Sequence, residues 1–403
     1  MRMRVGALTA LLLLAAGCGG QAANPVAAGT PSATAAPATA TLTPSPGATA
    51  SASPAPGESL PAVSFNCTRP VPVAHSLALV TLTGSDRTVV RDVTDPSHGQ
   101  TICTFTSNLE DARFVSATAV GYWVQGGQPE TDVYVADLSA GTSRLVAAIP
   151  NGLVGSALAW SPDGATFSYL TLSTAGGLEW HLLSNGTDQL LTSPLAPEKI
   201  VDTIPDQDDA YLSYSGDGAY LALLQRMSLD PSGATYATVE VRRADGTRLF
   251  YQTDVTMATW SSRYLYFFDN AQGIVRFWQP DAPQLGGMSI NQWVRPSSSP
   301  DGRYIVYTSL LAQGEHHARL LDLQASTDEQ ISPGGRIGAI FLSQGLVWYA
   351  GESPCPGQCG LGGPPTTGKT YVYDVASKTE ALSVITRVYD TWPHLGAGRR
   401  ALA

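Results

Sequence analysis

From about residue 62 onward, the chain alternates short apolar runs with polar residues that favour turns. The runs are rich in Val, Tyr, Leu, Phe and Thr, and Gly, Asp, Pro or Ser interrupts them every eight to twelve residues. In one run Tyr304 and Val306 would share one face of a strand and Ile305 the other, since side chains alternate along a strand. No long segment has the apolar period of 3.6 residues that indicates an amphipathic helix. The pattern therefore predicts an all-β domain.

One block of sequence recurs in three clear copies, which begin at Trp160, Tyr214 and Ser298, and a fourth copy at Trp260 has a shorter turn. The turn residues of the three copies are Pro162, Asp163, Gly164, Asp217, Gly218, Pro300, Asp301 and Gly302. Proline presets φ, the aspartate accepts hydrogen bonds from nearby backbone N–H groups, and glycine tolerates positive φ. Each copy therefore predicts a strand, a tight turn and a second strand.

Weaker copies centre on Phe114 and Phe341, so that six anchor positions (114, 160, 214, 260, 298 and 341) follow one another at intervals of 38 to 54 residues. A third strand and a poorer fourth strand follow each anchor. A four-stranded period of about 40–50 residues is typical of a β-propeller. With a unit at residues 76–82 we expect seven blades, six or eight being the alternatives. Residues 389–396 would supply the missing first strand of blade one, so that the N- and C-terminal strands share a blade. Two stacked sandwiches would not explain the repeat.

These turns, and the Asp-Leu or Asp-Val dipeptides that end the third strands, resemble the repeats of TolB-like and WD-like propellers. They are also similar to the propellers that accompany the catalytic domain of prolyl oligopeptidases. The resemblance covers residues 62–400 and implies a fold, since one fold serves many functions. The Gly-x-Ser-x-Gly motif of the peptidase domain is absent from the sequence. Peptidase activity is therefore not implied.

The N-terminus has the features of a bacterial lipoprotein signal. Arg2 and Arg4 precede an apolar stretch that is too short to span a bilayer, which needs roughly 20 residues. Residues 14–18 resemble a lipobox, in which Cys18 is lipidated after cleavage; the alternative is an ordinary secretory signal with a chance cysteine. Residues 1–17 are thus the expected signal peptide, residues 18–61 a disordered tether rich in Ala, Pro, Ser and Thr, and residues 62–403 the propeller. We expect an extracytoplasmic protein held at the membrane by Cys18.

Four further cysteines remain, namely Cys67, Cys103, Cys355 and Cys359. In an exported protein, two local disulfides are the default expectation. For Cys355 and Cys359 the alternative is a zinc or redox site, but no other Cys or His lies within 30 residues of them. We expect no metal and no cofactor.

Charge narrows the range of partners. The formal net charge is −10, and lysine occurs only at Lys199, Lys369 and Lys378. No basic stripe is available to neutralise a phosphate backbone, so nucleic-acid binding is not expected. Acidic residues between Asp202 and Asp209 suggest calcium as an alternative to a solvated loop, although the EF-hand glycine and terminal glutamate are missing.

Few residues stand out as candidates for recognition. Trp180, His181 and Trp293 fit the repeat least well, so we expect them at the rim, where they could contact a ligand. His316 and His317 are adjacent and would face opposite ways on a strand, so one metal cannot readily use both. We interpret them as an exposed loop pair.

The leading hypothesis is a monomeric, non-catalytic binding module, displayed on the cell envelope, that recognises a protein, peptide or glycan. The first alternative is a carbohydrate-active lyase or hydrolase with its site at the mouth of the propeller channel. That alternative requires an acid–base pair, which the spacing of the carboxylates does not reveal. The second alternative is a scaffold in an envelope complex, as the likeness to TolB suggests. The catalytic site residues remain unassigned.

Overall fold

The computed structural model of the protein describes residues 61–95, 99–125, 130–149, 158–172, 178–191, 210–228, 235–282, 284–290, 292–310, 315–353 and 366–392. Contacts divide the chain into two units, residues 1–54 and 55–403, and every described residue belongs to the second. The described residues form strands and turns and contain no helix. The prediction of an all-β domain is confirmed.

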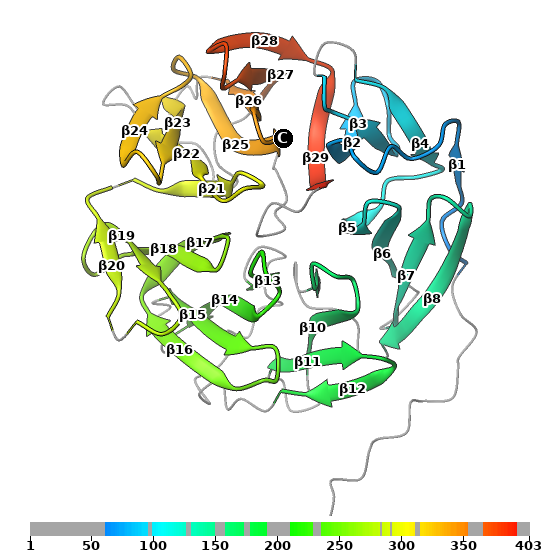
Figure 1. Cartoon of the computed structure of the whole chain (residues 1–403), viewed down its shortest axis with the longest axis horizontal. Helices are drawn as coiled ribbons and strands as arrows, with labels where there is room; N and C mark the ends of the chain where they lie inside the picture. The colour runs from blue at the N-terminus through cyan, green and yellow to red at the C-terminus, as the bar shows by residue number, and fades with distance from the viewer. Residues whose placement is uncertain are drawn as a thin grey trace, which may run out of the picture. The chain divides into compact units, whose positions relative to one another are not determined.

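Seven antiparallel sheets form a ring of blades in the second unit (Figure 1). Blade 2 contains β5 (Glu110–Ser116), β6 (Ala119–Gln125), β7 (Thr131–Asp137) and β8 (Thr142–Ile149). Blade 3 contains β9 (Leu158–Trp160), β10 (Thr166–Leu172), β11 (Leu178–Ser184) and β12 (Thr187–Leu190). Blade 4 contains β13 (Ala210–Tyr214), β14 (Tyr220–Ser228), β15 (Thr235–Arg243) and β16 (Arg248–Thr253).

The next three blades continue the same pattern. Blade 5 contains β17 (Val255–Ser261), β18 (Tyr264–Asp269), β19 (Ile274–Trp278) and β20 (Gly286–Met288). Blade 6 contains β21 (Val294–Ser298), β22 (Tyr304–Leu310), β23 (His316–Asp322) and β24 (Thr327–Gln330). Blade 7 contains β25 (Arg336–Ser343), β26 (Leu346–Glu352), β27 (Thr366–Asp374) and β28 (Thr379–Ser383).

Blade 1 combines both ends of the described chain. Its strands are β1 (Phe65–Cys67), β2 (Leu77–Leu82), β3 (Thr88–Asp92), β4 (Thr101–Phe105) and β29 (Ile385–Trp392), and their order in the sheet is β1-β4-β3-β2-β29. The predictions of seven blades and of a shared terminal blade are therefore confirmed. The closing strand begins at Ile385, upstream of the expected Tyr389, because buried Ile385 and Val388 extend its pairing with β2. The fifth strand, β1, was not predicted.

The six anchor positions occupy equivalent places in blades 2 to 7. Each anchor lies on the first strand of its blade and pairs with a residue of the second strand. The pairs are Phe114 with Val120, Trp160 with Phe167, Tyr214 with Leu221, Trp260 with Leu265, Ser298 with Ile305 and Phe341 with Val347. The sequence period thus corresponds to one blade.

The antiparallel order gives the ring two different ends. Connections from the first strand to the second, and from the third to the fourth, leave one end, which we call the turn end. Connections from the second strand to the third, and from the fourth to the next blade, leave the other, which we call the loop end. The two longest connections between strands, residues 191–209 and 353–365, both leave the loop end.

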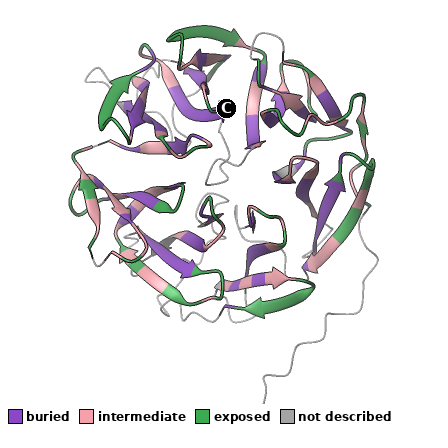
Figure 2. Cartoon of the chain, viewed as in Figure 1, coloured by how far each residue is buried: buried purple, intermediate pink, exposed green. Residues whose placement is uncertain are grey.

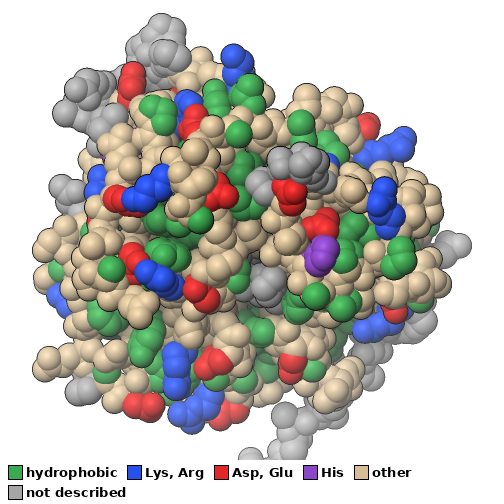
Figure 3. All heavy atoms as spheres, turned by 45° about the horizontal axis from the view of Figure 1, so that its top comes forward, with side chains coloured by type: hydrophobic (Ala, Val, Ile, Leu, Met, Phe, Trp, Pro, Cys, Tyr) green, Lys and Arg blue, Asp and Glu red, His purple; other side chains and the backbone are tan. Residues whose placement is uncertain are grey.

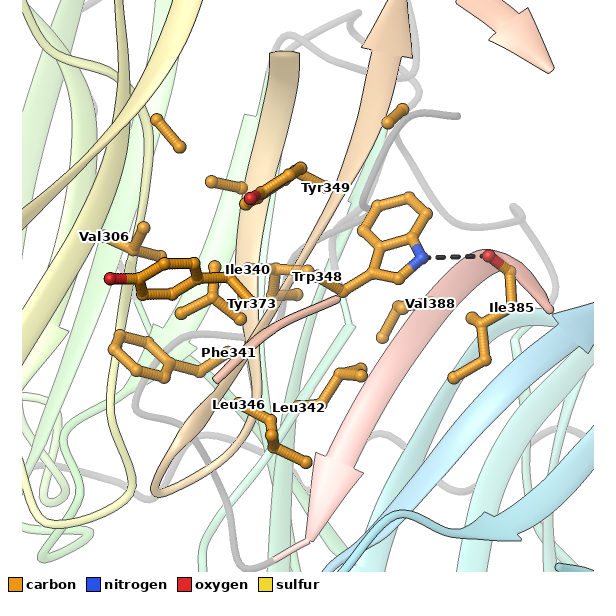
Figure 4. Close-up of a cluster of buried hydrophobic side chains, with 14 of the residues drawn as sticks. Val306, Ile340, Phe341, Leu342, Leu346, Trp348, Tyr349, Tyr373, Ile385 and Val388 are labelled. Atoms are coloured by element: carbon orange, nitrogen blue, oxygen red, sulfur yellow. Dashed lines mark hydrogen bonds between the residues drawn. The ribbon is translucent and has the colours of Figure 1, made fainter. Parts of the chain in front are cut away.

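The core lies between blades, and the outermost strands are the most exposed (Figure 2). One cluster joins blades 6, 7 and 1 (Figure 4). At its centre the buried Trp348 of β26 donates a hydrogen bond from its indole nitrogen to the carbonyl of Ile385 on β29, at 2.9 Å. The same side chain therefore fills apolar space and satisfies its polar atom across the boundary between blades 7 and 1.

Candidate functional site

The three full copies of the turn motif have the same hydrogen bonds. In the first copy Ser161 donates from its hydroxyl to Asp163 Oδ1 at 2.5 Å, and the same carboxylate oxygen accepts from the backbone N–H of Ala165 at 3.0 Å. The hydroxyl of Ser161 also accepts from the N–H of Thr166 at 3.0 Å. The donation from Ser161 lowers the pKa of Asp163, since it stabilises the charged carboxylate.

The other copies repeat this geometry. Ser215 donates to Asp217 at 2.6 Å, and Ser299 donates to Asp301 at 2.6 Å. The glycine that follows each aspartate has positive φ, with values of 67°, 71° and 68° at Gly164, Gly218 and Gly302. From the sequence, the turn was assigned to Pro, Asp and Gly, and the role of the serine was missed. Its signal was available, because a serine precedes the aspartate by two residues in all three copies.

These turns also join neighbouring blades at the turn end. The N–H of Gly216 in blade 4 donates to the carbonyl of Ser262 in blade 5 at 2.8 Å. The hydroxyl of Ser261 donates to the carbonyl of Gly302 in blade 6 at 2.6 Å, and the N–H of Asp301 donates to Gln344 of blade 7 at 3.1 Å. The motif therefore holds the ring together as well as each hairpin.

Trp180 and Trp293 lie in the packing between blades, and their exposed fractions are 1% and 3%. Trp180 donates to the hydroxyl of Ser168 at 2.6 Å, and Trp293 donates to the carbonyl of Met257 at 2.8 Å. This placement differs from the expected rim position. Neither indole has a face that is accessible to a ligand in this structure.

His181 is the centre of a polar cluster on blade 3. Its Nδ1 lies 3.0 Å from Asp188 Oδ2, its Nε2 lies 3.8 Å from Glu179 Oε2, and Tyr169 stacks on its ring at 4.8 Å. Its side chain is 15% exposed, whereas those of Asp188 and Glu179 are 42% and 36% exposed. The two carboxylates orient the imidazole and leave acidic oxygens at the surface, an arrangement suited to holding a cationic group.

His316 and His317 are the first two residues of β23 and face opposite sides of blade 6, as expected. They are not an exposed loop pair, which corrects the interpretation from sequence. Glu352 of blade 7 accepts from the backbone N–H of His316 at 2.9 Å and lies 2.8 Å from its Nδ1. His317 is 3% exposed, and neither of its ring nitrogens has a hydrogen-bond partner among the described residues.

The environment of His317 disfavours its charged form. Burial lowers its pKa, and the nearby positive charge of Arg319 acts in the same direction. Arg319 itself is paired with Asp328 at 3.0 Å, so that this carboxylate is already engaged. Glu352 therefore links blades 6 and 7 through His316, while His317 is a buried neutral group.

Cys67 and Cys103 form a disulfide, which confirms the first expected pair. The two residues lie directly opposite each other on β1 and β4. Several other sequence predictions lie outside the described residues, namely Cys18, Cys355, Cys359 and the stretch 202–209. Among the residues that the structure describes, no group of three or more His, Cys, Asp or Glu side chains is arranged to hold a metal ion.

Charged side chains of both signs are interspersed on the face shown in Figure 3. Among the described residues, charged side chains also form pairs between strands or blades, such as Arg303 with Asp322 at 2.6 Å and Lys378 with Glu329 at 3.0 Å. The described side chains on this face form no continuous basic stripe. Within the described part of the chain, no helix is long and apolar enough to cross a membrane.

Comparison with protein-family models gives no match, and comparison with curated proteins gives none either. Solved structures do match. A prolyl endopeptidase structure has 14% identity and a TM-score of 0.53, covering 77% of this chain and 50% of that one. The tricorn protease has 10% identity and a TM-score of 0.50, with 82% and 36% covered. TolB from Acinetobacter baumannii has 14% identity and a TM-score of 0.42, with 79% and 66% covered.

The chain spans from 36% to 66% of the length of these three proteins. At such low identity, likeness to a solved structure concerns the fold alone. The prolyl endopeptidase and tricorn matches agree with the ring of four-stranded sheets described above. The chain therefore has the β-propeller fold.

Proposed function

We propose that this protein is a non-catalytic binding module, anchored in the cell envelope by a lipid on Cys18 and connected to its propeller by residues 19–61. Its binding face is the loop end of the ring, and its partner is a protein, peptide or glycan. Each methylene group of an acyl chain that enters the bilayer contributes about 0.8 kcal/mol, so two acyl chains are enough for stable anchoring. The tether gives the propeller room to meet a partner.

The asymmetry of the two ends carries this proposal. At the turn end, short turns bond to one another, as Gly216 does to Ser262 and Ser261 does to Gly302. The two longest stretches of sequence between strands, 191–209 and 353–365, join strands that end and begin at the loop end. Because binding residues concentrate on loops that a rigid scaffold positions, this asymmetry favours recognition at the loop end.

Charge indicates the kind of partner. The connection 191–209 contains Glu198, Asp202, Asp206, Asp208 and Asp209, but only Lys199 as a basic residue. A partner with basic groups would meet complementary charge there, which raises association rates and suppresses acidic partners. Calcium binding at 202–209 stays a prediction. The described residues give no specific support to a carbohydrate-active enzyme or a scaffold, so both alternatives stay predictions as well.

Two experiments test the proposal. Cys18→Ala should move the protein from the membrane fraction to the soluble fraction, whereas a Cys355→Ser variant should stay with the membrane. An unchanged distribution of the Cys18→Ala variant would refute the anchor.

For the binding face, Asp202, Asp206, Asp208 and Asp209 are changed together to asparagine. A control variant carries Asp95→Asn and Asp281→Asn at the turn end, where both residues are exposed. Photo-crosslinking on cells should recover the same partner with the native chain and the control and lose it with the loop-end variant. Equal recovery from all three would place binding elsewhere. Turnover of a glycan panel by the native chain would contradict the absence of catalysis.

A further inference from the structure

The first described residues form an arm that joins blade 1 to blade 2. Val63 donates from its backbone N–H to the hydroxyl of the buried Tyr122 in blade 2 at 3.1 Å. The ring of Phe65 packs against that of Phe105 in blade 1, with the ring centres 5.2 Å apart and the planes tilted by 36°. β1 then adds to the outer edge of β4, and the Cys67–Cys103 disulfide joins the two strands at their last paired residues.

The arm leads directly to β2, the strand that pairs with the closing strand β29. Residues 68–76 connect β1 to β2, and β2 pairs with the C-terminal strand β29, for example through Leu77 with Trp392 and Ala78 with Thr391. No covalent link joins β29 to β2, because β29 is reached through blade 7. Hydrogen bonds and packing therefore hold this closure.

Residues 68–76 are held to the propeller by non-covalent contacts, since Val71 packs against the core cluster of blades 1 and 2 and the carbonyl of Ser76 accepts a hydrogen bond from the N–H of Val93 at 2.9 Å. Thr68 donates from its N–H to the carbonyl of Ile102 at 2.9 Å, and the His75–Asp92 pair at 2.6 Å is exposed. Exposed ion pairs contribute little to stability. A chain pulled from its N-terminus would first unpair β1, residue by residue from Phe65, then release 68–76 and finally pull on β2.

We propose that the Cys67–Cys103 disulfide is a strain-relief staple, which keeps tension on the N-terminal tether from reaching the β2–β29 closure. Peeling from Phe65 stops at Cys67, because the covalent bond passes the load to Cys103 on β4. In the sheet order, β3 separates β4 from β2. The load thus enters blade 1 away from its closing strands. This inference rests on the proposed function, since a lipid anchor is the source of the tension.

Single-molecule force spectroscopy tests the staple on the full-length chain, unlipidated through Cys18→Ala. One handle is placed at the N-terminus and the other at Tyr264 of blade 5, which is 39% exposed. The Cys67→Ser/Cys103→Ser variant should show an early rupture that includes residues 68–76. The first rupture of this variant should therefore lengthen the chain by about 30 Å more than the first rupture of the native chain does. Equal extension and equal force in the two chains would overturn the proposal.

Two further arms keep the result decisive. The native chain pulled in dithiothreitol should behave like the serine variant, and this arm does not require the variant to fold. Cys355→Ser/Cys359→Ser is the matched control, because it removes two cysteines but keeps the staple, and it should behave like the native chain. The force result is independent of membrane fractionation, so a missing anchor and a missing staple give different outcomes.

Discussion

Asp390 of the C-terminal strand accepts a hydrogen bond from the backbone N–H of Phe114, the first anchor of the repeat, at 2.7 Å. Next to it, Arg113 donates from Nη1 to the carbonyl of Tyr389, also at 2.7 Å. Both contacts join β29 in blade 1 to β5 in blade 2. The strand that closes blade 1 is thus also held by its neighbour, through groups that are 276 residues apart in sequence.

Removing this acceptor should weaken ring closure. Asp390→Ala leaves the buried N–H of Phe114 without its carboxylate, and we expect a loss of about 1–3 kcal/mol in the free energy of unfolding. Asp390→Asn keeps an oxygen acceptor and should lose less. Urea denaturation of the two variants measures the difference, and equal stability of Asp390→Ala and the native chain would contradict the closing role of Asp390.

Two glycines with similar φ separate backbone strain from contact between blades. Gly302 and Gly273 have φ values of 68° and 66°. A Cβ on Gly302 would lie 3.1 Å from the backbone nitrogen of Ser262 in blade 5, whereas one on Gly273 would have nothing within 4 Å. Gly273→Ala should lower the free energy of unfolding by about 1–2 kcal/mol because of its positive φ alone, and Gly302→Ala should lower it by more. Thermal unfolding provides the comparison, and equal losses would mean that the turns pack loosely between blades.

A buried ion pair on β15 of blade 4 packs against Trp180 of blade 3. Arg242 bonds to Glu240 at 2.7 Å, its guanidinium lies 5.0 Å from the centre of the Trp180 ring, and both charged side chains are almost fully buried. Arg242→Met leaves the buried Glu240 carboxylate without its positive partner and should lower the free energy of unfolding by about 3–5 kcal/mol. The double variant with Glu240→Leu removes both charges and should be more stable than Arg242→Met alone. If the double variant instead lost as much unfolding free energy as the two single variants together, the two side chains would not be coupled.

His317 should make stability depend on pH. Burial lowers its folded-state pKa below the unfolded value of about 6.5, and Arg319 adds to the effect, so the unfolded state binds more protons between these two pKa values. The contribution of neutral His317 is present above the unfolded pKa and is lost as the pH falls below it. The slope reaches at most about 1.4 kcal/mol per pH unit.

His317→Leu removes this titration while keeping an apolar side chain at the site. The free energy of unfolding is measured for the native chain and for His317→Leu from pH 7.5 to 5. As the pH falls, the native chain should lose more of it than His317→Leu does. Taking the difference removes contributions that the two chains have in common. A difference independent of pH would show that His317 finds a partner for its charged form.

The residues of the repeated turn could be recognised from sequence because their interactions are local. Asp163 bonds to groups two residues away on either side, and Gly164 has a backbone conformation that its own lack of a Cβ permits. The spacing of the anchors likewise follows from chain length alone, since one blade needs four strands and their turns. The fold, the number of blades and the disulfide of Cys67 were therefore predictable.

The candidate site was less predictable, because burial depends on the neighbouring blade. Trp180 and Trp293 interrupt the repeat in sequence and yet fill space between sheets. Glu179 lies two residues before His181 on β11, but Asp188 and Tyr169 meet His181 only because β12 and β10 pair with β11 on its two sides.

Local pattern thus determined which segments of this protein become strands and turns, since alternation and turn chemistry act over a few residues. Only the tertiary structure decided that Asp390 meets Phe114, that His317 is buried with no hydrogen-bond partner among the described residues and that β1 covers the edge of β4. These contacts join segments far apart in the chain. They depend on how seven blades pack around one ring, which no short window of sequence contains.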